Sequence, residues 1–257
     1  MLGVFLLKPW IGITVHVDDG KSDDLYPQHP LMYIESDYIK AIEVHGMHPI
    51  LLPVLDDTSE IESYLSKLDG LLVTGGGYLN LDKPLPSSPD LSGTGDTRYS
   101  FEFVLLQQAL NAGLPILGVC RGMQMLNEVH GGTLENLCSD HHHQEVLGIE
   151  SDILTHSIEL KKESKLSEIL GSDYIDVNSR HRQKIFSLGN GLREVGWSSK
   201  DRVIEAIESE NKSWVFGLQF HPEQLYKRDP RWSSLFNDLK RAAKQYSQTK
   251  LKKEKVY

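Results

Sequence analysis

Cys120 is the residue best placed in this sequence to act as a nucleophile. It lies in the segment Gly118-Val119-Cys120-Arg121-Gly122, directly after the apolar run LPILGV and directly before a stretch with helical periodicity. A strand, a sharp turn and a helix in this order form a nucleophile elbow, here with cysteine in the position of serine. The two glycines let strand and helix approach without Cβ clashes, and the helix N-terminus favours the thiolate. The alternative is a buried core cysteine beside two packing glycines.

A cysteine nucleophile needs a general base, and His221 is the strongest candidate among the 11 histidines. It closes the apolar run WVFGLQF and is followed by Pro222 and Glu223. In an extended chain, residues two apart point the same way, so the Glu223 carboxylate can reach the imidazole and fix its tautomer. We therefore expect Cys120, His221 and Glu223 to form a catalytic triad. The alternative for His221 is a strand-end histidine near a solvated carboxylate.

The glycine run after Thr74 can supply a backbone donor to a reaction intermediate. Gly75, Gly76 and Gly77 follow an apolar strand-like run, and their N–H groups are not obstructed by side chains. Together with the N–H of Arg121, this turn can form an oxyanion hole. The run does not fit a phosphate-binding loop, because neither a Gly-Lys-Ser/Thr ending nor a GxGxxG motif is present. Taken alone, it is equally well interpreted as a plain glycine turn.

The histidine run at positions 141 to 143 raises the question of a metal site. Adjacent loop residues point in divergent directions, and no acidic or cysteine partner at ligand spacing accompanies His141, His142 and His143. We therefore expect no metal ion and no other cofactor. Cys138, the second of two cysteines, is expected to be a passive thiol because no CxxC pair exists.

Charge and hydropathy exclude several classes of partner. The chain has 36 acidic and 27 basic side chains, a net charge of -9, so no basic surplus is available for binding a phosphate backbone. No stretch approaches the roughly 18 consecutive apolar residues of a membrane span, and Lys8 and Pro9 interrupt the opening MLGVFLL before it forms a secretory core. We expect a soluble, cytoplasmic protein with a small-molecule substrate and without nucleic-acid or membrane partners. The sequence leaves a homodimer open.

Alternating strand-like and helix-like segments in the first half predict a parallel sheet covered by helices on both faces. The expected strands are Trp10 to Val15, Pro49 to Val54, Gly70 to Thr74 and Pro115 to Val119. The expected helices are Tyr33 to Val44, Thr58 to Lys67 and Ser100 to Ala112. Each helix is near the length that a right-handed crossover requires.

The second half predicts shorter strands that extend the same sheet. These are Ile153 to Leu160, Leu192 to Ser198, Val203 to Glu208 and Trp214 to Phe220, followed by an amphipathic helix from Trp232 to Tyr246. No linker divides the chain, so we expect an α/β fold with a single domain at residues 8–247 and a polar C-terminal tail at 248–257.

At these motifs the sequence resembles the class I glutamine amidotransferase superfamily and, within it, the gamma-glutamyl-gamma-aminobutyrate hydrolase family of gamma-glutamyl peptidases. The resemblance extends from about Lys8 to Glu223. It rests on KPWIGIT at 8–14, DGLLVTGGG at 69–77, PILGVCRGMQMLN at 115–127, GGTL at 131–134, VNSRHRQ at 177–183, VIEAIE at 203–208 and GLQFHPE at 217–223. It implies a flavodoxin-like α/β domain whose central sheet is mostly parallel.

The resemblance also assigns roles within the site. It implies Cys120 as nucleophile, His221 as base and Glu223 as orienting acid, with Gly76 as the oxyanion donor among the three glycines. It further implies that five residues line the pocket for the gamma-glutamyl group: Gln124, Asn178, Ser179, His181 and Gln183.

Three departures from the family pattern concern leaving-group specificity. Relatives commonly have an acidic residue where this chain has Tyr78, a second histidine in place of Arg182, and an Arg-Asp pair where this chain reads Arg98-Tyr99. The long loop from Gly77 to Tyr99 is the expected wall or lid of the leaving-group site, because loops of this length are uncommon unless functional or disordered.

We expect a hydrolase that cleaves an amide on the gamma-carboxyl group of glutamate through a gamma-glutamyl thioester. The main alternative is a glutaminase subunit that delivers ammonia to a separate synthetase chain. A cysteine version of the α/β-hydrolases is less consistent, because there the acid precedes the histidine in the chain. A non-catalytic binding protein on the same scaffold is a further alternative.

Overall fold

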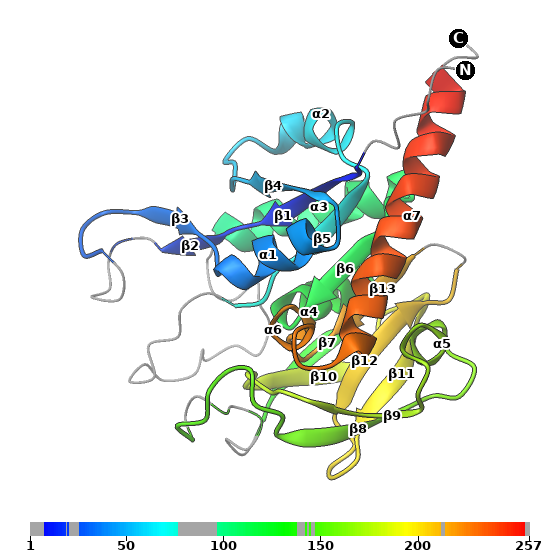
Figure 1. The fold of residues 1–257 in the computed structure, drawn as a ribbon. Coiled ribbons are helices and arrows are strands. Elements are labelled where there is room, and N and C mark those ends of the chain that lie inside the picture. The colour runs from blue at the N-terminus through cyan, green and yellow to red at the C-terminus, as the bar shows by residue number, and fades with distance from the viewer. Residues whose placement is uncertain are drawn as a thin grey trace.

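The computed structural model describes residues 8–18, 20, 26–76, 97–137, 142, 144, 147–211 and 214–254. Within these residues, nine strands form one sheet in the order β4-β1-β5-β6-β13-β12-β11-β8-β9 (Figure 1). Strands from both halves of the chain take part, so the expected continuation of one sheet through a single α/β domain is confirmed.

The first half of the sheet is parallel. It contains β4 (His48–Leu52), β1 (Trp10–Thr14), β5 (Gly70–Val73), β6 (Ile116–Val119) and β13 (Val215–Leu218). β5, β6 and β13 are buried along their whole length. Continuous apolar runs suit such strands because both faces of a parallel sheet are covered.

The second half of the sheet is antiparallel, so the complete sheet is mixed. β12 (Ile204–Ser209), β11 (Leu192–Ser198), β8 (His156–Leu160) and β9 (Tyr174–Val177) follow β13 in this order. Two short pairs lie outside this sheet, β10 (Gln183–Ser187) with β7 (Thr133–Asn136) and β2 (His16–Asp18) with β3 (Leu31–Tyr33).

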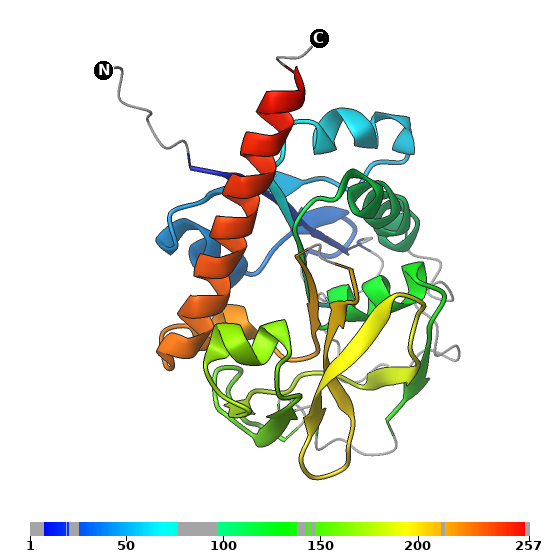
Figure 2. The same ribbon diagram turned by 90° about the vertical axis from the view of Figure 1, so that its right-hand side faces the viewer.

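Helices cover both faces of the sheet, as the alternating pattern predicts. The core on one face includes residues of α1 (Ser36–Val44), α5 (Lys165–Leu170), α6 (Pro222–Leu225) and α7 (Pro230–Glu254). The core on the other face includes residues of α2 (Ile61–Leu65), α3 (Thr97–Ala112) and α4 (Arg121–Val129). Figure 2 shows α7 on one side of the sheet and α2 with α3 on the other.

Several element boundaries differ from the sequence expectation. The segment from Thr58 begins as a 3₁₀ turn (Thr58–Glu60), in which Asp57 accepts a hydrogen bond from the Ser59 N–H, before α2 starts. β8 starts at His156, because the chain from Ser151 to Ile153 forms a turn and a bend. α7 continues past Tyr246 to Glu254, into the segment expected to be a polar tail. The helices α5 and α6 and the short strands β2, β3, β7, β9 and β10 were not predicted.

No helix within the described ranges is both long and apolar enough to cross a membrane.

Candidate active site

The sheet brings the three predicted reactive segments together at one edge. β6 pairs in parallel with β5 on one side and with β13 on the other. The glycine turn follows β5, Cys120 follows β6, and His221 comes shortly after β13 (Figure 1). Because the carboxyl ends of parallel strands meet at the same edge, segments far apart in sequence become neighbours. This edge is where open α/β sheets place their ligands.

Cys120 adopts the strained backbone of an elbow. Its φ is +51°, in a region that residues with a Cβ rarely adopt, and it forms the N-cap of α4. Its N–H donates to the carbonyl of Leu218 on β13 over 2.6 Å, which ties the turn to the neighbouring strand. The strain is therefore held by the sheet, as is typical of a functional site.

The two glycines beside the elbow are required by close packing. A Cβ on Gly118 would lie 2.6 Å from the carbonyl oxygen of Gly122, and a Cβ on Gly122 would lie 2.1 Å from the carbonyl oxygen of Val73. Both distances are shorter than any van der Waals contact. The predicted reason for these glycines, close approach of strand and helix, is thus present in the structure, and β5 takes part in it as well.

Cys120, His221 and the glycine turn converge on a single point. A Cβ built on Gly75 would lie 3.0 Å from Cε1 of His221 and 3.4 Å from the Cβ of Cys120. His221 Nδ1 lies 2.7 Å from Oε1 of Glu223, and the Glu223 side chain is fully buried. The spacing of two residues between histidine and carboxylate therefore has the predicted geometry, although Glu223 lies in the first turn of α6 and not in an extended strand.

The electrostatics of the pair favour a thiolate and an imidazolium. Burial alone lowers the pKa of His221, but the Glu223 charge and the hydrogen-bonding interaction with Cys120 outweigh it and raise this pKa to about 10. Burial alone raises the pKa of the Cys120 thiol, but His221 outweighs it and lowers this pKa below its ordinary value. Apart from the facing thiol, His221 Nε2 has no hydrogen-bond partner among the described residues.

Two residues outside the predicted triad hold His221 in place. The hydroxyl of Tyr38 on α1 accepts a hydrogen bond from the Gly75 N–H over 3.0 Å and lies 3.4 Å from His221 Nδ1. The side chain of Asn178 accepts a hydrogen bond from the His221 N–H over 2.9 Å. Sequence reasoning gave no role to Tyr38, because its position on an amphipathic helix is indistinguishable from that of a core residue.

The structure describes the two backbone N–H groups, of Gly76 and Arg121, that are expected to form the oxyanion hole. The Gly75 N–H is taken by Tyr38, whereas Gly76 is exposed and a Cβ there would have no neighbour within 4 Å. Arg121 is the first residue of α4, and N–H groups in a first helical turn have no intrahelical acceptor. Gly77, Tyr78 and the expected lid up to position 96 lie outside the described residues.

A buried ionic network contacts Thr74, the residue directly before the glycine turn. Arg98 donates to Oε1 of Glu102 over 2.9 Å and to Oγ1 of Thr74 over 2.9 Å, while the Arg121 guanidinium forms an ion pair with the same carboxylate. Burial alone raises the pKa of Glu102, but the two arginines outweigh it and lower this pKa. Burial, with the charges of Arg98 and Arg121, lowers the pKa of His16 to about 2, so its neutral Nδ1 accepts a hydrogen bond from Arg98. Arg98, which the chain shares with the Arg-Asp pair of its relatives, thus positions Thr74, and the departure from the pair lies at the neighbouring Tyr99.

The five residues expected to line the substrate pocket each make contacts within the protein. Asn178 and Ser179 are fully buried, and the Ser179 hydroxyl donates to the carbonyl of His142 over 2.8 Å. Gln124 donates to the carbonyl of Gln183 over 3.1 Å, and His181 Nδ1 lies 2.9 Å from the same carbonyl. Their contact with a substrate stays a prediction, whereas the role of Asn178 in holding His221 is visible.

The histidine run has acidic neighbours in three dimensions. His142 lies next to Glu205 and Asp201, although neither is near it in sequence. Spacing along the chain does not indicate these acidic neighbours, because they come from segments about 60 residues away in the sequence. His141, His143 and Cys138 lie outside the described residues.

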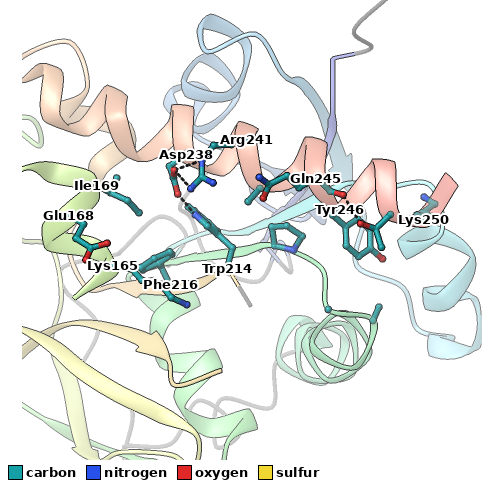
Figure 3. A pocket seen from close by; sticks show the side chains of 15 residues that line it. Lys165, Glu168, Ile169, Trp214, Phe216, Asp238, Arg241, Gln245, Tyr246 and Lys250 are labelled. Atoms are coloured by element: carbon teal, nitrogen blue, oxygen red, sulfur yellow. Dashed lines mark hydrogen bonds and ion pairs between the residues drawn. The ribbon is translucent and has the colours of Figure 1, made fainter. Parts of the chain in front are cut away.

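A cavity of about 660 Å³ lies away from Cys120, beside α5 and α7 (Figure 3). Trp214 lines it and donates through Nε1 to Oδ2 of Asp238 over 2.6 Å. None of the predicted site residues lines this cavity.

A cysteine elbow, a strand-end histidine-glutamate pair and a glycine turn on one edge of an α/β sheet define a protein of the class I glutamine amidotransferase-like type. In agreement, the fold is similar to the crystal structure of a glutamine amidotransferase from Thermotoga maritima, with a TM-score of 0.55, 16% sequence identity, and coverage of 96% of this chain and 98% of that one. The family model of peptidase C26 matches residues 9–223, and the chain belongs to this family.

Two curated relatives support the same assignment. A protein named as glutamine amidotransferase-like, YvdE of Lactococcus lactis, is 37% identical over 205 residues, which cover 77% of this chain and 83% of the relative. The gamma-glutamyl-gamma-aminobutyrate hydrolase PuuD of Escherichia coli is 30% identical over 211 residues, which cover 76% of this chain and 80% of the relative. The chain is thus a glutamine amidotransferase-like hydrolase of the peptidase C26 family.

Proposed function

We propose that this protein hydrolyses the amide bond between the gamma-carboxyl group of glutamate and a small amine, with Cys120, His221 and Glu223 as its catalytic triad. One observation carries the proposal: a cysteine in a strained elbow faces a buried histidine whose other ring nitrogen lies 2.7 Å from a buried carboxylate. This arrangement of nucleophile, base and orienting acid is the common geometry of covalent amide hydrolysis.

The reaction proceeds in two halves. The Cys120 thiolate attacks the gamma-carbonyl carbon, and the N–H groups of Gly76 and Arg121 stabilise the oxyanion that forms. The C–N bond breaks as the His221 imidazolium gives its proton to the leaving amine, and a gamma-glutamyl thioester remains on Cys120. His221 then takes a proton from water, the resulting hydroxide attacks the thioester, and glutamate leaves as the thiolate is restored.

The gamma-glutamyl specificity is supported by the relatives. PuuD of Escherichia coli is named for cleaving gamma-glutamyl-gamma-aminobutyrate, and its similarity to this chain covers most of both proteins. Gln124, Asn178, Ser179, His181 and Gln183 are proposed to frame the pocket for the glutamyl part. The described residues do not define the leaving-group side, because the loop expected to form its wall falls outside them.

A glutaminase subunit is the second candidate, and the names of several relatives favour it. YvdE is named for its likeness to glutamine amidotransferases. Such a subunit has the same triad, but delivers ammonia to a synthetase carried by another chain. The two candidates differ in whether the isolated chain turns over and in which amide it prefers.

The decisive experiment incubates the purified chain alone with glutamine, gamma-glutamyl-gamma-aminobutyrate and a short poly-gamma-glutamate, and measures released glutamate. A hydrolase releases glutamate from at least one amide other than glutamine without a partner.

Cys120→Ala should reduce kcat on the order of 10⁶-fold, as expected for loss of a covalent nucleophile. The matched control Cys138→Ala should keep full activity. Full activity in Cys120→Ala would contradict the triad, and cleavage of glutamine alone, slow until a partner is added, would favour the subunit.

A further inference from the structure

A second cluster of reactive side chains surrounds Glu205 on β12. The Glu205 side chain is fully buried, and imidazoles from three other segments approach it: His142, His156 on β8, and His181 in the chain between β9 and β10. A buried carboxylate is costly unless it is paired with a cation and hydrogen-bonded. Neither oxygen of Glu205 has a well-formed hydrogen bond among the described residues.

The distances in this cluster match the spacing of metal ligands. Glu205 Oε1 lies 3.2 Å from Nε2 of His156 and 3.6 Å from Nδ1 of His142. One ligand atom from each of these three residues lies within 4.8 Å of the other two. Zn–N bonds of about 2.0 to 2.1 Å in a tetrahedron place two ligand atoms roughly 3.3 Å apart. The two pairs that include Glu205 Oε1 are therefore already near this spacing, and an ion bound to all three atoms requires the two histidine nitrogens to lie about as close to each other.

The outer contacts of the cluster have the arrangement typical of metal ligands. His142 Nε2 lies 2.8 Å from Oδ2 of Asp201, and its Nδ1 lies 3.2 Å from the Ser179 hydroxyl and 3.6 Å from Glu205 Oε1, so an ion bound at Nδ1 would replace the contact with Ser179. In metal sites, a ligating histidine almost always donates its second N–H to a carboxylate, a carbonyl or water, and a ligating carboxylate is itself hydrogen-bonded. His181 is the nearest group for the latter purpose: its Nε2 lies 3.6 Å from Glu205 Oε1, slightly beyond hydrogen-bond distance, and its Nδ1 is held by the Gln183 carbonyl.

Charge and access also fit a divalent cation. The carboxylates of Glu205 and Asp201 balance two positive charges when the histidines are neutral. A cavity of about 340 Å³, lined by His142, His156, Ser198 and Lys200 together with apolar residues, lies against the two histidines. It provides an approach path for the ion and room for a water molecule as a fourth ligand.

We propose that His142, His156 and Glu205 form a binding site for a divalent transition-metal ion of the Zn²⁺ type, with Asp201 and His181 as the outer groups that orient the ligands. The three ligands are distinct from the Cys120 triad, whereas the outer group His181 also belongs to the expected substrate pocket and acts on the pKa of Cys120. The site connects β8 and β12 to the chain around His142, whose carbonyl accepts hydrogen bonds from the His181 N–H and the Ser179 hydroxyl. The bound ion therefore stabilises the segment that includes Asn178, which holds His221.

The test measures Zn²⁺ binding to the full chain carrying Cys120→Ala and Cys138→Ala, so that no thiol competes for the ion. The chain is stripped with a chelator, dialysed, and titrated with Zn²⁺ against a chromophoric competitor. We expect one tightly bound equivalent per chain and visible absorption when Co²⁺ replaces Zn²⁺. Asp201→Asn should weaken binding on the order of 10- to 100-fold, as is typical of an outer-ligand change.

Ligand substitutions complete the test. His156→Ala should lose binding by more than Asp201→Asn, and His156 is partly accessible, so the variant should fold. Glu205→Gln should also lose the ion, and circular dichroism checks that each variant is folded. The matched control His29→Ala, at an exposed position, should keep the full affinity. The proposal is overturned if the parent chain binds no stoichiometric Zn²⁺, or if binding persists unchanged in both His156→Ala and Glu205→Gln.

Discussion

The ionisation of Cys120 depends on a histidine that is buried yet remains protonated. An imidazole at 4% exposure loses most of its hydration, which by itself favours the neutral form. The Glu223 carboxylate at 2.7 Å reverses this preference, the Tyr38 hydroxyl contacts the same ring nitrogen, and Asn178 holds the backbone N–H of His221. The buried carboxylate two residues beyond the histidine thus raises the pKa of His221, and His221 in turn lowers the pKa of the Cys120 thiol.

This charge balance predicts a broad pH optimum. The lowered pKa of Cys120 places the acid limb of kcat/KM below the range of an ordinary thiol, and the His221 pKa of about 10 places the alkaline limb near that value. Above it, His221 has no proton to give to the leaving amine. The two limbs belong to the coupled pair and not to either residue alone.

Glu223→Gln should narrow this optimum and reduce kcat. Removing the negative charge lowers the pKa of His221, so the alkaline limb moves to lower pH, and the weaker cation raises the pKa of Cys120, so the acid limb moves to higher pH. The loss in kcat should be on the order of 10² to 10⁴. A pH-rate profile of the variant beside Glu62→Gln, an exposed control, measures both effects. An unchanged profile would remove Glu223 from the mechanism.

At the scale of elements, the site depends on three neighbouring strands that end at the same level. β5, β6 and β13 each contribute one reactive segment, and α4 packs so closely on β5 that Gly122 touches the carbonyl of Val73. Cys120 is the N-cap of α4, so it lies at the helix terminus, where the helix dipole acts. The spacing of glycines around the cysteine is thus a requirement of packing between elements.

Gly122→Ala should therefore disrupt the site and the fold together. A Cβ 2.1 Å from the Val73 carbonyl forces α4 away from β5, which should cost at least about 3 kcal/mol of unfolding free energy. Gly113→Ala is the matched control: its Cβ meets open space, and its φ of +70° limits the cost to about 1 to 2 kcal/mol. Urea unfolding and glutamate release measure the two variants. Equal stability losses in both would contradict the packing argument.

At the scale of the whole molecule, α7 supports the site from outside it. Trp232 on α7 is fully buried, and its ring centre lies 5.1 Å from that of Phe220, the residue directly before His221. The C-terminal helix therefore packs against the chain that carries the candidate base. Residues of α1 and α7 belong to the same hydrophobic core on one face of the sheet. The first and last helices therefore stabilise the same face.

Trp232→Ala should destabilise the protein by about 3 to 5 kcal/mol, the usual cost of removing a large buried aromatic side chain. The void left by the missing Trp232 ring would adjoin Phe220, the residue directly before His221, so kcat should fall as well. Trp10→Ala provides the control, since Trp10 is 44% exposed and should cost no more than about 1 kcal/mol. Chemical denaturation with activity measured in parallel tests the pair. A loss of stability no greater than that of Trp10→Ala would show that α7 does not support this face.

The amino-acid sequence contains enough local information to predict the elbow, the histidine-glutamate pair and the alternating strands and helices. Each of these is a short-range pattern: glycines flanking Cys120, a carboxylate two residues after His221, and apolar runs of strand length before both. Such patterns are legible because backbone geometry and side-chain periodicity act over a few residues. The short strands β7, β9 and β10 carry no comparable pattern, since their formation depends on the neighbours with which they pair.

Contacts between distant segments have no such signature, and folding alone creates them. Tyr38 reaches Gly75 and His221, Arg98 reaches Thr74, and Glu205 gathers histidines from positions 142, 156 and 181. His181 and Glu205 each stand in a motif that resembles the family, yet nothing along the chain indicates that they meet. The physical reason is that these groups meet only when the helices pack on the sheet. Their burial in the packed structure then shifts their pKa values.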